Sequence, residues 1–255
     1  MKVVILCGGK GTRFREYPEE IPKPLAPVGG KPILWHLMKT YSHYGYKDFI
    51  LCLGYKGDMI KKYFIEEEWR ASDFTMNLKN RQKQTLATGE EEDWNITFAD
   101  TGVETNTGGR LKKIEKYIPA GEDFFATYGD GLANVNINEL LEFHKKKGKI
   151  ATITCLRPYS QFGVVEMDDS IVTSFKEKPR LDYWINGGFF VFKKEVFSHI
   201  SDNDVLEKKP FETLAAKKEI AAYKFDGFWQ CMDTFKDYQS FNELWEKGAP
   251  WKVWK

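Results

Sequence analysis

The sequence predicts an α/β fold in which a mostly parallel, mixed sheet is flanked by helices. Short β-branched runs alternate with segments of helical periodicity over residues 1–156, which is the pattern of a parallel sheet. A glycine-rich loop at residues 8–11 directly follows the first apolar run. After residue 156 the order changes to hairpins. Together these observations predict a Rossmann-like single domain over residues 1–255, with a second half rich in strands.

Each element of the first half follows from its own pattern. Residues 2–7 form an apolar, β-branched run that stops at the first glycines. Pro32 opens a helix in which Ile33, Leu37 and Tyr41 recur at helical spacing. The other expected elements of this half are strands over 48–53, 94–100 and 124–128 and helices over 56–64 and 107–117. This order of strand, loop and helix predicts that most strands run in parallel.

The second half is expected to begin with a helix over 137–147 and a strand over 150–156. Its later elements are a hairpin over 163–175, an extended run over 184–192, a strand over 220–225 and helices over 210–218 and 234–246. Residues 66–94 fit none of these patterns, because two acidic clusters flank a polar middle rich in Lys and Gln. Such an insertion is long for a bare loop, so we expect a small subdomain or an arm of a homo-oligomer.

Composition limits the classes of function. Hydrophobic residues make up 42% and charged residues 29%, and 38 basic residues nearly balance 37 acidic ones. The net charge of +1 leaves no dominant basic face, so binding of nucleic acid or of an anionic membrane is not expected. The sequence has no apolar run long enough for a bilayer, no signal-peptide pattern and no metal-binding spacing among its cysteines. These features predict a cytoplasmic protein with local phosphate binding.

Three short motifs near the amino terminus carry the chemistry. The loop Gly8-Gly9-Lys10-Gly11-Thr12-Arg13 lets the backbone approach an anion and adds a hydroxyl and a guanidinium suited to phosphate oxygens. It has neither the ending of a Walker A loop nor the spacing of a dinucleotide fingerprint. Lys23 stands between two prolines, and Gly30-Lys31-Pro32 leads into the first helix. Each motif taken alone is also compatible with a tight turn or a solvated loop.

In this order and spacing, the three motifs resemble the signature of the sugar-1-phosphate nucleotidyltransferases, also called sugar-nucleotide pyrophosphorylases. The resemblance covers essentially the whole chain, with matching segments at residues 125–130, 175–179, 185–188 and 229–234. It implies an enzyme that joins a nucleoside triphosphate to a sugar 1-phosphate and releases pyrophosphate. Residues 1–133 would form the nucleotide-binding half, and residues 134–255 would form the half that binds the sugar phosphate.

The resemblance also implies roles for individual residues. The nucleotide is expected to contact Leu6, Gly8, Gly9, Lys10, Gly11, Thr12, Arg13, Lys23, Thr107, Gly109, Arg110 and Asp130. The sugar phosphate is expected to contact Gly163, Glu177, Lys178, Asn186, Gly187 and Trp229. Asp130 and Asp233 would hold Mg²⁺, and the catalytic set would be Arg13, Lys23, Asp130 and Lys178. The sugar phosphate is already ionised at neutral pH, so its attack on the α-phosphorus requires no general base.

Several segments resemble the branch of the family that transfers a cytidylyl group from CTP to α-D-glucose 1-phosphate. They include residues 54–57, 107–111, 186–191 and 245–252. Arg110 is a donor, and cytosine offers O2 and N3 as acceptors where uracil presents N3–H, so the direction of donation favours cytosine. The product, CDP-glucose, would serve deoxysugar and surface-polysaccharide biosynthesis, including O-antigen and lipopolysaccharide. One departure concerns the sugar, because Gln161-Phe162-Gly163 stands where the family usually has Arg-Phe-Gly.

Other functions share parts of this pattern. A thymidylyl- or uridylyltransferase would use the same mechanism, and a catalytically silent regulator would keep the fold. Retention of Lys23, Asp130, Lys178 and Asp233 speaks against the regulator. A glycosyltransferase would need an Asp-x-Asp-like pair after a strand, and Gly129-Asp130-Gly131 supplies one carboxylate. Individual roles also have alternatives, since Trp229 fits a packed core and Arg110 fits an ion pair with Glu115 on its own helix.

Overall fold

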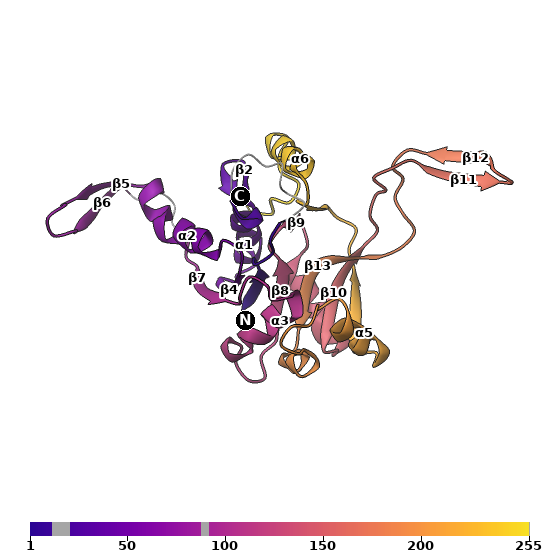
Figure 1. Cartoon of the computed structure of the whole chain (residues 1–255), viewed down its shortest axis with the longest axis horizontal. Helices are drawn as coiled ribbons and strands as arrows, with labels where there is room; N and C mark the ends of the chain where they lie inside the picture. The colour runs from indigo at the N-terminus through magenta and orange to yellow at the C-terminus, as the bar shows by residue number, and fades with distance from the viewer. Residues whose placement is uncertain (12–20, 88–91, 255) are drawn as a thin grey trace.

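The computed structural model describes residues 1–11, 21–87 and 92–254. Its centre is a seven-stranded sheet in the order β14, β10, β13, β8, β1, β4, β7 (Figure 1). The strands are β1 Val3–Leu6, β4 Asp48–Leu53, β7 Asn95–Asp100, β8 Phe124–Tyr128, β10 Ala151–Leu156, β13 Ile185–Phe192 and β14 Ile220–Lys224. Strand β13 runs antiparallel to β8 and β10, and the other neighbours in this sheet pair in parallel. The predicted mostly parallel, mixed sheet is confirmed.

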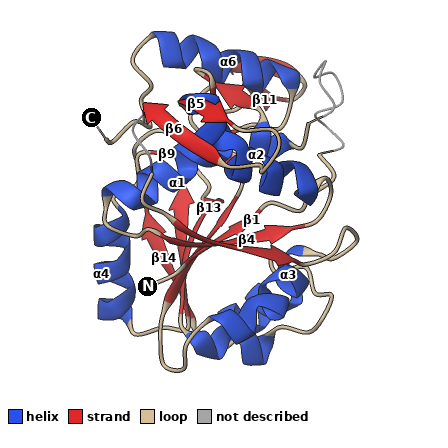
Figure 2. Ribbon diagram, turned by 90° about the vertical axis from the view of Figure 1, so that its left-hand side faces the viewer, coloured by secondary structure: helices blue, strands red, loops and turns tan. Residues whose placement is uncertain are grey.

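Helices cover both faces of the sheet and bury two cores (Figure 2). Helices α1 Ile33–His43, α2 Gly57–Ala71, α4 Ile137–Lys147 and α6 Phe235–Glu246 contribute to one core, and α3 Thr107–Ile114 and α5 Lys209–Ala216 contribute to the other. Val3 and Ile5 of β1 belong to the first core, and Val4 and Leu6 belong to the second. Burial on both faces explains why β1 reads as a continuous apolar run.

Two short strand pairs lie outside the main sheet and were not expected from the sequence. Strand β2 Pro27–Val28 pairs with β3 Lys31–Pro32, and β9 Gly131–Ala133 pairs with β15 Trp229–Cys231. Three 3-10 helices, η2 Lys23–Leu25, η3 Glu115–Tyr117 and η4 Lys194–His199, complete the connections. Among the described helices, none combines the length and the apolar composition that crossing a bilayer would require.

Two hairpins project from opposite sides of the sheet (Figure 1). One is β5 Asp73–Met76 with β6 Lys83–Ala87, and the other is β11 Val164–Asp168 with β12 Ile171–Lys176. We call them the 73–87 arm and the 164–176 arm. The second hairpin was predicted. Within residues 66–94, where the sequence predicted a small subdomain or an arm, α2 continues beyond its expected end at residue 64, because glutamates favour helix, and the 73–87 arm follows it.

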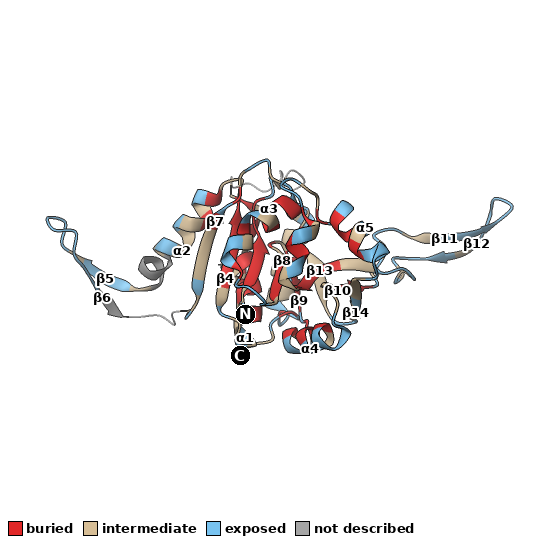
Figure 3. Ribbon diagram, turned by 90° about the horizontal axis from the view of Figure 1, so that it is seen from below, coloured by how far each residue is buried: buried red, intermediate tan, exposed pale blue. Residues whose placement is uncertain are grey.

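Both arms consist largely of exposed residues (Figure 3), and some of these are apolar. Leu78 on the first arm is 73% exposed, and Met167 and Ile171 on the second are 66% and 70% exposed. Each arm is a two-stranded hairpin without a core of its own. Such hairpins are marginally stable alone and gain stability by packing against another surface.

His36 on α1 lies at the centre of a buried aromatic cluster. Its ring centroid is 5.1 Å from that of Trp245 and 5.9 Å from that of Trp251. Its Nε2 atom lies 2.8 Å from the carbonyl oxygen of Val28. Burial disfavours the charged ring more than the backbone hydrogen bonds favour it, and it lowers the pKa of His36 from 6.5 to about 4.

We expect the free energy of unfolding to decrease as the pH falls from 7 to 5. The pKa of His36 is lower in the folded chain than in the unfolded chain, so its contribution is fully present above pH 6.5 and is lost between about pH 6.5 and pH 4. At pH 5 the expected loss is about 2 kcal/mol. Urea denaturation of the wild type and of His36→Gln at both pH values measures this contribution of His36 to the free energy of unfolding. Equal pH dependence in the two proteins would rule it out.

Candidate functional site

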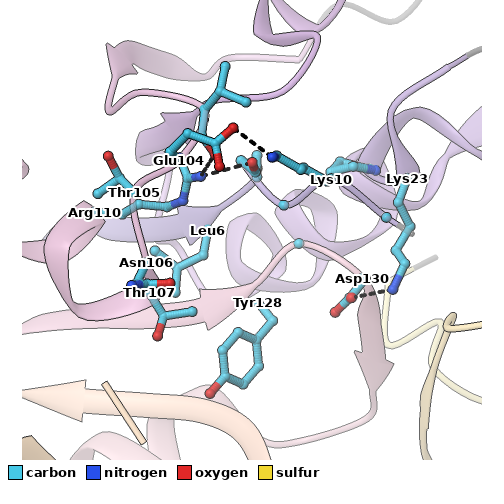
Figure 4. Close-up of a pocket in the computed structure, with 17 residues that line it drawn as sticks. Leu6, Lys10, Lys23, Glu104, Thr105, Asn106, Thr107, Arg110, Tyr128 and Asp130 are labelled. Atoms are coloured by element: carbon cyan, nitrogen blue, oxygen red, sulfur yellow. Dashed lines mark hydrogen bonds and ion pairs between the residues drawn. The ribbon is translucent and has the colours of Figure 1, made fainter. Parts of the chain in front are cut away.

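A pocket of about 440 Å³ opens at the carboxyl ends of β1 and β8 (Figure 4). It is formed by the loop after β1, the segment that leads into α3 and the turn after β8. Open α/β sheets bind ligands at the carboxyl ends of their strands. The residues expected to contact the nucleotide that line this pocket are Leu6, Gly8, Gly9, Lys10, Gly11, Lys23, Thr107, Arg110 and Asp130. Thr12 and Arg13, which were expected to contact it too, lie outside the described residues.

Lys23 joins the two aspartates that were expected to hold a metal. Its Nζ atom lies 2.8 Å from Oδ2 of Asp130 and 2.8 Å from Oδ1 of Asp233. The Lys23 side chain is 11% exposed. Burial alone would lower the pKa of Lys23, but the charge of Asp130 and the hydrogen bonds to both carboxylates outweigh burial and raise it. Lys23 therefore stays protonated between the carboxylates.

Two aspartates from distant parts of the sequence meet here because of the small β9–β15 pair. Asp130 lies between β8 and β9, and one residue, Met232, separates Asp233 from the end of β15. Cys231 pairs with Gly131 in this ladder, and the backbone N–H of Met232 donates to the carbonyl of Asp130 at 2.8 Å. The ladder therefore brings both carboxylates to one edge of the pocket.

The donor chemistry of these two residues fits Mg²⁺. Their oxygens already converge on one cationic nitrogen, and Mg²⁺ prefers hard oxygen donors. Within residues 1–11, 21–87 and 92–254, no group of three or more His, Cys, Asp or Glu side chains forms a cation site. An ion held here would thus take most of its ligands from water and from phosphate oxygens, as Mg²⁺ commonly does in nucleotide enzymes.

Arg110 lies in the wall of the pocket and is 4% exposed. Its Nη1 atom donates to Thr101 Oγ1 at 2.7 Å, to the carbonyl of Gly102 at 2.8 Å and to that of Leu53 at 3.1 Å. Its Nη2 atom donates to the carbonyls of Gly8 at 2.9 Å and Val103 at 3.2 Å. The structure shows no ion pair of Arg110 with Glu115, because the guanidinium is directed to these acceptors instead, and Lys112 contacts that carboxylate at 2.8 Å. Arg110 thus ties the glycine-rich loop to β4 and to the segment before α3. Its recognition of the base stays a prediction.

The close approach of Arg110 makes Gly8 sensitive to substitution. A Cβ atom added at Gly8 would lie 2.0 Å from Nη1 of Arg110, whereas one added at Gly9 would meet nothing within 4 Å. Gly8→Ala must displace the Arg110 guanidinium, which would break hydrogen bonds that hold the glycine-rich loop, so we expect CTP to bind about tenfold more weakly. Isothermal titration of CTP into both alanine variants measures the effect. An equal loss of CTP affinity in Gly9→Ala would mean that the added methyl group crowds the ligand and that displacement of Arg110 is not the cause.

Gly109 was expected to contact the nucleotide, but the structure places it against the segment 202–204. Its backbone N–H donates to the carbonyl of Asp204 at 3.1 Å. An added Cβ would lie 2.3 Å from the carbonyl oxygen of Asp202. The absence of a side chain therefore admits a neighbouring backbone segment at this position. The contact of Gly109 with the nucleotide stays a prediction.

The residues expected to bind the sugar phosphate fall into two groups. Asn186 donates from Nδ2 to the hydroxyl of the pocket residue Tyr128 at 3.2 Å, and Trp229 donates from Nε1 to the carbonyl of Gly187 at 2.7 Å. Asn186 thus contacts a residue of the pocket lining, and Trp229 contacts the neighbouring Gly187. The others, Gly163, Glu177 and Lys178, lie at the base of the 164–176 arm, where the side chain of Lys178 is 58% exposed. The structure does not bring that group to the pocket lining, and its role stays a prediction.

The sequence reasoning missed several polar residues at the site, among them Thr105 and Asn106, which line the pocket. Tyr128 lines the pocket beside Asp130, and Glu104 lines it while forming an ion pair with Lys10 at 2.6 Å. Glu207 accepts hydrogen bonds from Tyr128 and Thr107. The position of Tyr128 directly before Gly129-Asp130 is a signal that could have identified it. Glu104 and Glu207 belong to no recognisable motif.

Comparison with known proteins agrees with this geometry. The chain is 47% identical to glucose-1-phosphate cytidylyltransferase of Salmonella typhi and 47% identical to the probable glucose-1-phosphate cytidylyltransferase of Bacillus subtilis, in each case over 100% of both chains. The crystal structure of HddC from Yersinia pseudotuberculosis superposes with a TM-score of 0.70, at 23% identity over 96% of this chain and 99% of that one. The profile of the nucleotidyl transferase family matches residues 2–248. With this match, and with relatives that align over its full length, the chain belongs to the nucleotidyl transferase family.

Proposed function

We propose that this chain transfers a cytidylyl group from CTP to α-D-glucose 1-phosphate, giving CDP-glucose and pyrophosphate. The observation that carries nucleotidyl transfer is the convergence of Lys23, Asp130 and Asp233 at the edge of a pocket with a glycine-rich loop. The choice of CTP and glucose 1-phosphate is supported by the names of relatives that are 47% identical over the whole chain.

In the proposed reaction an oxygen of the sugar phosphate attacks the α-phosphorus of CTP, and the bond to pyrophosphate breaks. No proton transfer is needed, because the attacking phosphate is ionised at neutral pH. The loop at residues 8–11 holds the triphosphate through its backbone, and Lys23 offsets charge on the phosphates. Asp130 and Asp233 would hold Mg²⁺, which would neutralise charge on the phosphate oxygens. Catalysis then rests mainly on positioning and electrostatics.

The sugar is proposed to bind beside Tyr128, where Asn186 and Gly187 lie. Lys178 would contact the phosphate of glucose 1-phosphate, which requires that the base of the 164–176 arm and the pocket approach each other. We also propose that the chain forms a homo-oligomer in which the apolar side chains of the two arms are buried. Light scattering after gel filtration tests the assembly, and a monomer at micromolar concentration would contradict it.

The test of the function is pyrophosphate release across four nucleoside triphosphates and several sugar 1-phosphates. The highest kcat/KM is expected with CTP and glucose 1-phosphate. A higher value with UTP or dTTP would favour the uridylyl- or thymidylyltransferase, which would use the same pocket. Turnover with none of the pairs, together with CTP binding, would favour the nucleotide-binding regulator.

The cellular role follows from the same proposal. All four cysteines are free thiols, and those of Cys7, Cys52 and Cys155 are buried. Free thiols suit a reducing compartment, so the enzyme is proposed to act in the cytoplasm. Its product is proposed to enter deoxysugar synthesis for O-antigen and lipopolysaccharide. Metabolite analysis of a strain that lacks the protein tests this role, since CDP-glucose should disappear.

A further inference from the structure

A continuous series of hydrogen bonds joins the nucleotide side of the pocket to the sugar side, and Glu207 lies at its centre. Thr107, the first residue of α3, donates from Oγ1 to Oε2 of Glu207 at 2.8 Å. Tyr128, at the end of β8, donates from its hydroxyl to Oε1 of the same carboxylate. Asn186 on β13 donates from Nδ2 to that tyrosine hydroxyl at 3.2 Å. Glu207 thus joins α3 to β8, and the Tyr128 hydroxyl extends the series to β13.

The direction of every hydrogen bond in this series is determined by its neighbours. The Thr107 hydroxyl accepts from the backbone N–H of Leu206 at 2.9 Å, so its own proton is directed to the carboxylate. The Tyr128 hydroxyl accepts from Asn186, so its own proton is directed to the carboxylate of Glu207 as well. Oδ1 of Asn186 accepts from the backbone N–H of Gly188 at 2.9 Å, which orients its amide. An ionised carboxylate, which only accepts, satisfies both hydroxyls at once.

Packing restricts the position of the Tyr128 ring and therefore of its hydroxyl. The ring lies against Gly188, where an added Cβ would be 2.5 Å from Cδ2 of Tyr128, and edge to face with Phe190 at 5.5 Å between centroids. The ring is confined on its faces, and Glu207 and Asn186 determine where its hydroxyl points.

We propose that Glu207 is a positioning residue that couples the nucleotide subsite, through Thr107, to the sugar subsite, through Tyr128 and Asn186. The proposal rests on the function proposed above, because it assigns the two sides of the pocket to the two substrates. Glu207 does not itself line the pocket, whereas Thr107 and Tyr128 do. Its effect on the reaction is therefore exerted through these two hydroxyls.

The first experiment compares Glu207→Gln with the wild type by steady-state kinetics. A glutamine amide can accept from only one of the two hydroxyls, and its NH₂ group opposes the other. We expect kcat/KM to fall about tenfold for CTP and for glucose 1-phosphate alike, with unchanged thermal melting because Glu207 is exposed. Glu212→Gln, an exposed carboxylate on α5, is the matched control and should retain wild-type kinetics.

A double-mutant cycle separates positioning from general disturbance of the structure. Thr107→Val and Tyr128→Phe each remove one hydroxyl. When Glu207 is present, the fold-change in kcat/KM of the double variant should differ from the product of the two single fold-changes by at least threefold. In the Glu207→Gln background the two effects should multiply independently. Independent effects with Glu207 present, or wild-type kinetics in Glu207→Gln, would overturn the proposal. Absence of turnover with CTP and glucose 1-phosphate in the wild type would instead overturn the proposed function. The cycle would then be run with the substrate pair that the screen identifies.

Discussion

Replacing Asp130 or Asp233 by asparagine is expected to abolish turnover while the chain still folds. Asparagine has nearly the same shape but no charge, and each aspartate directs an anionic oxygen to one point occupied by Nζ of Lys23. The β9–β15 ladder that positions them uses the backbone carbonyl of Asp130, which the substitution leaves in place. Removal of one group that stabilises developing charge costs about 10²–10³ in rate, and loss of a metal ligand should cost at least as much.

Pyrophosphate release with saturating Mg²⁺ measures the rate, and binding of Mn²⁺ followed by electron paramagnetic resonance measures the metal site separately. Asp48→Asn is the matched control, because Asp48 also pairs with a lysine, Lys2, at 2.8 Å but lies away from the pocket lining. We expect wild-type rates and Mn²⁺ binding in this control. Rates near those of the wild type in Asp130→Asn or Asp233→Asn would show that the carboxylate concerned holds no metal used in turnover.

The main sheet could be predicted because its strands are buried on both faces. The expected ranges 48–53 and 124–128 coincide with β4 and β8, since each is a continuous apolar run. The β9–β15 ladder could not be predicted. Its strands have three residues each, and their pairing depends on a tertiary contact that leaves no local periodicity. This short ladder is nevertheless what brings Asp130 and Asp233 together.

The site likewise has features that the sequence could predict and features that it could not. Resemblance to a family pointed to Lys23 and both aspartates, but the partners of Arg110 are mostly backbone carbonyls, and a carbonyl has no signature in the sequence. Glu207 lies in an exposed, lysine-rich segment, and its two hydroxyl donors come from residues far away in the chain. Its role becomes visible only when the fold places Thr107 and Tyr128 on the two sides of its carboxylate.

Lys23→Met is expected to change the affinities for metal and for nucleotide in opposite directions. In the ligand-free chain the Lys23 ammonium occupies the point where the two carboxylates converge, so it competes with a divalent cation for the same oxygens. Its removal leaves two neighbouring carboxylates without their shared counter-charge. We therefore expect the free variant to bind Mn²⁺ about tenfold more tightly than the wild type. The same variant loses a charge-assisted contact to the triphosphate, worth about 1.5–3 kcal/mol, so its affinity for CTP should fall by one to two powers of ten.

Electron paramagnetic resonance of Mn²⁺ and isothermal titration of CTP without metal measure the two affinities independently. Lys10→Met is the matched control, since it removes the same charge from the same pocket, where Lys10 pairs with Glu104 rather than with the aspartates. The control should weaken CTP binding without tightening Mn²⁺ binding. Tighter Mn²⁺ binding in both variants would mean that the overall charge of the pocket, and not the placement of Lys23, governs metal affinity. If neither affinity changes in Lys23→Met, the ion pair with Asp130 and Asp233 has no part in binding the metal or in binding CTP. An opposite change in the two affinities would mean that Lys23 competes with a metal for the two carboxylates and also contributes to binding of the triphosphate. Binding of the triphosphate and of the metal would then favour each other, because phosphates that draw Lys23 away would leave the carboxylates to the metal.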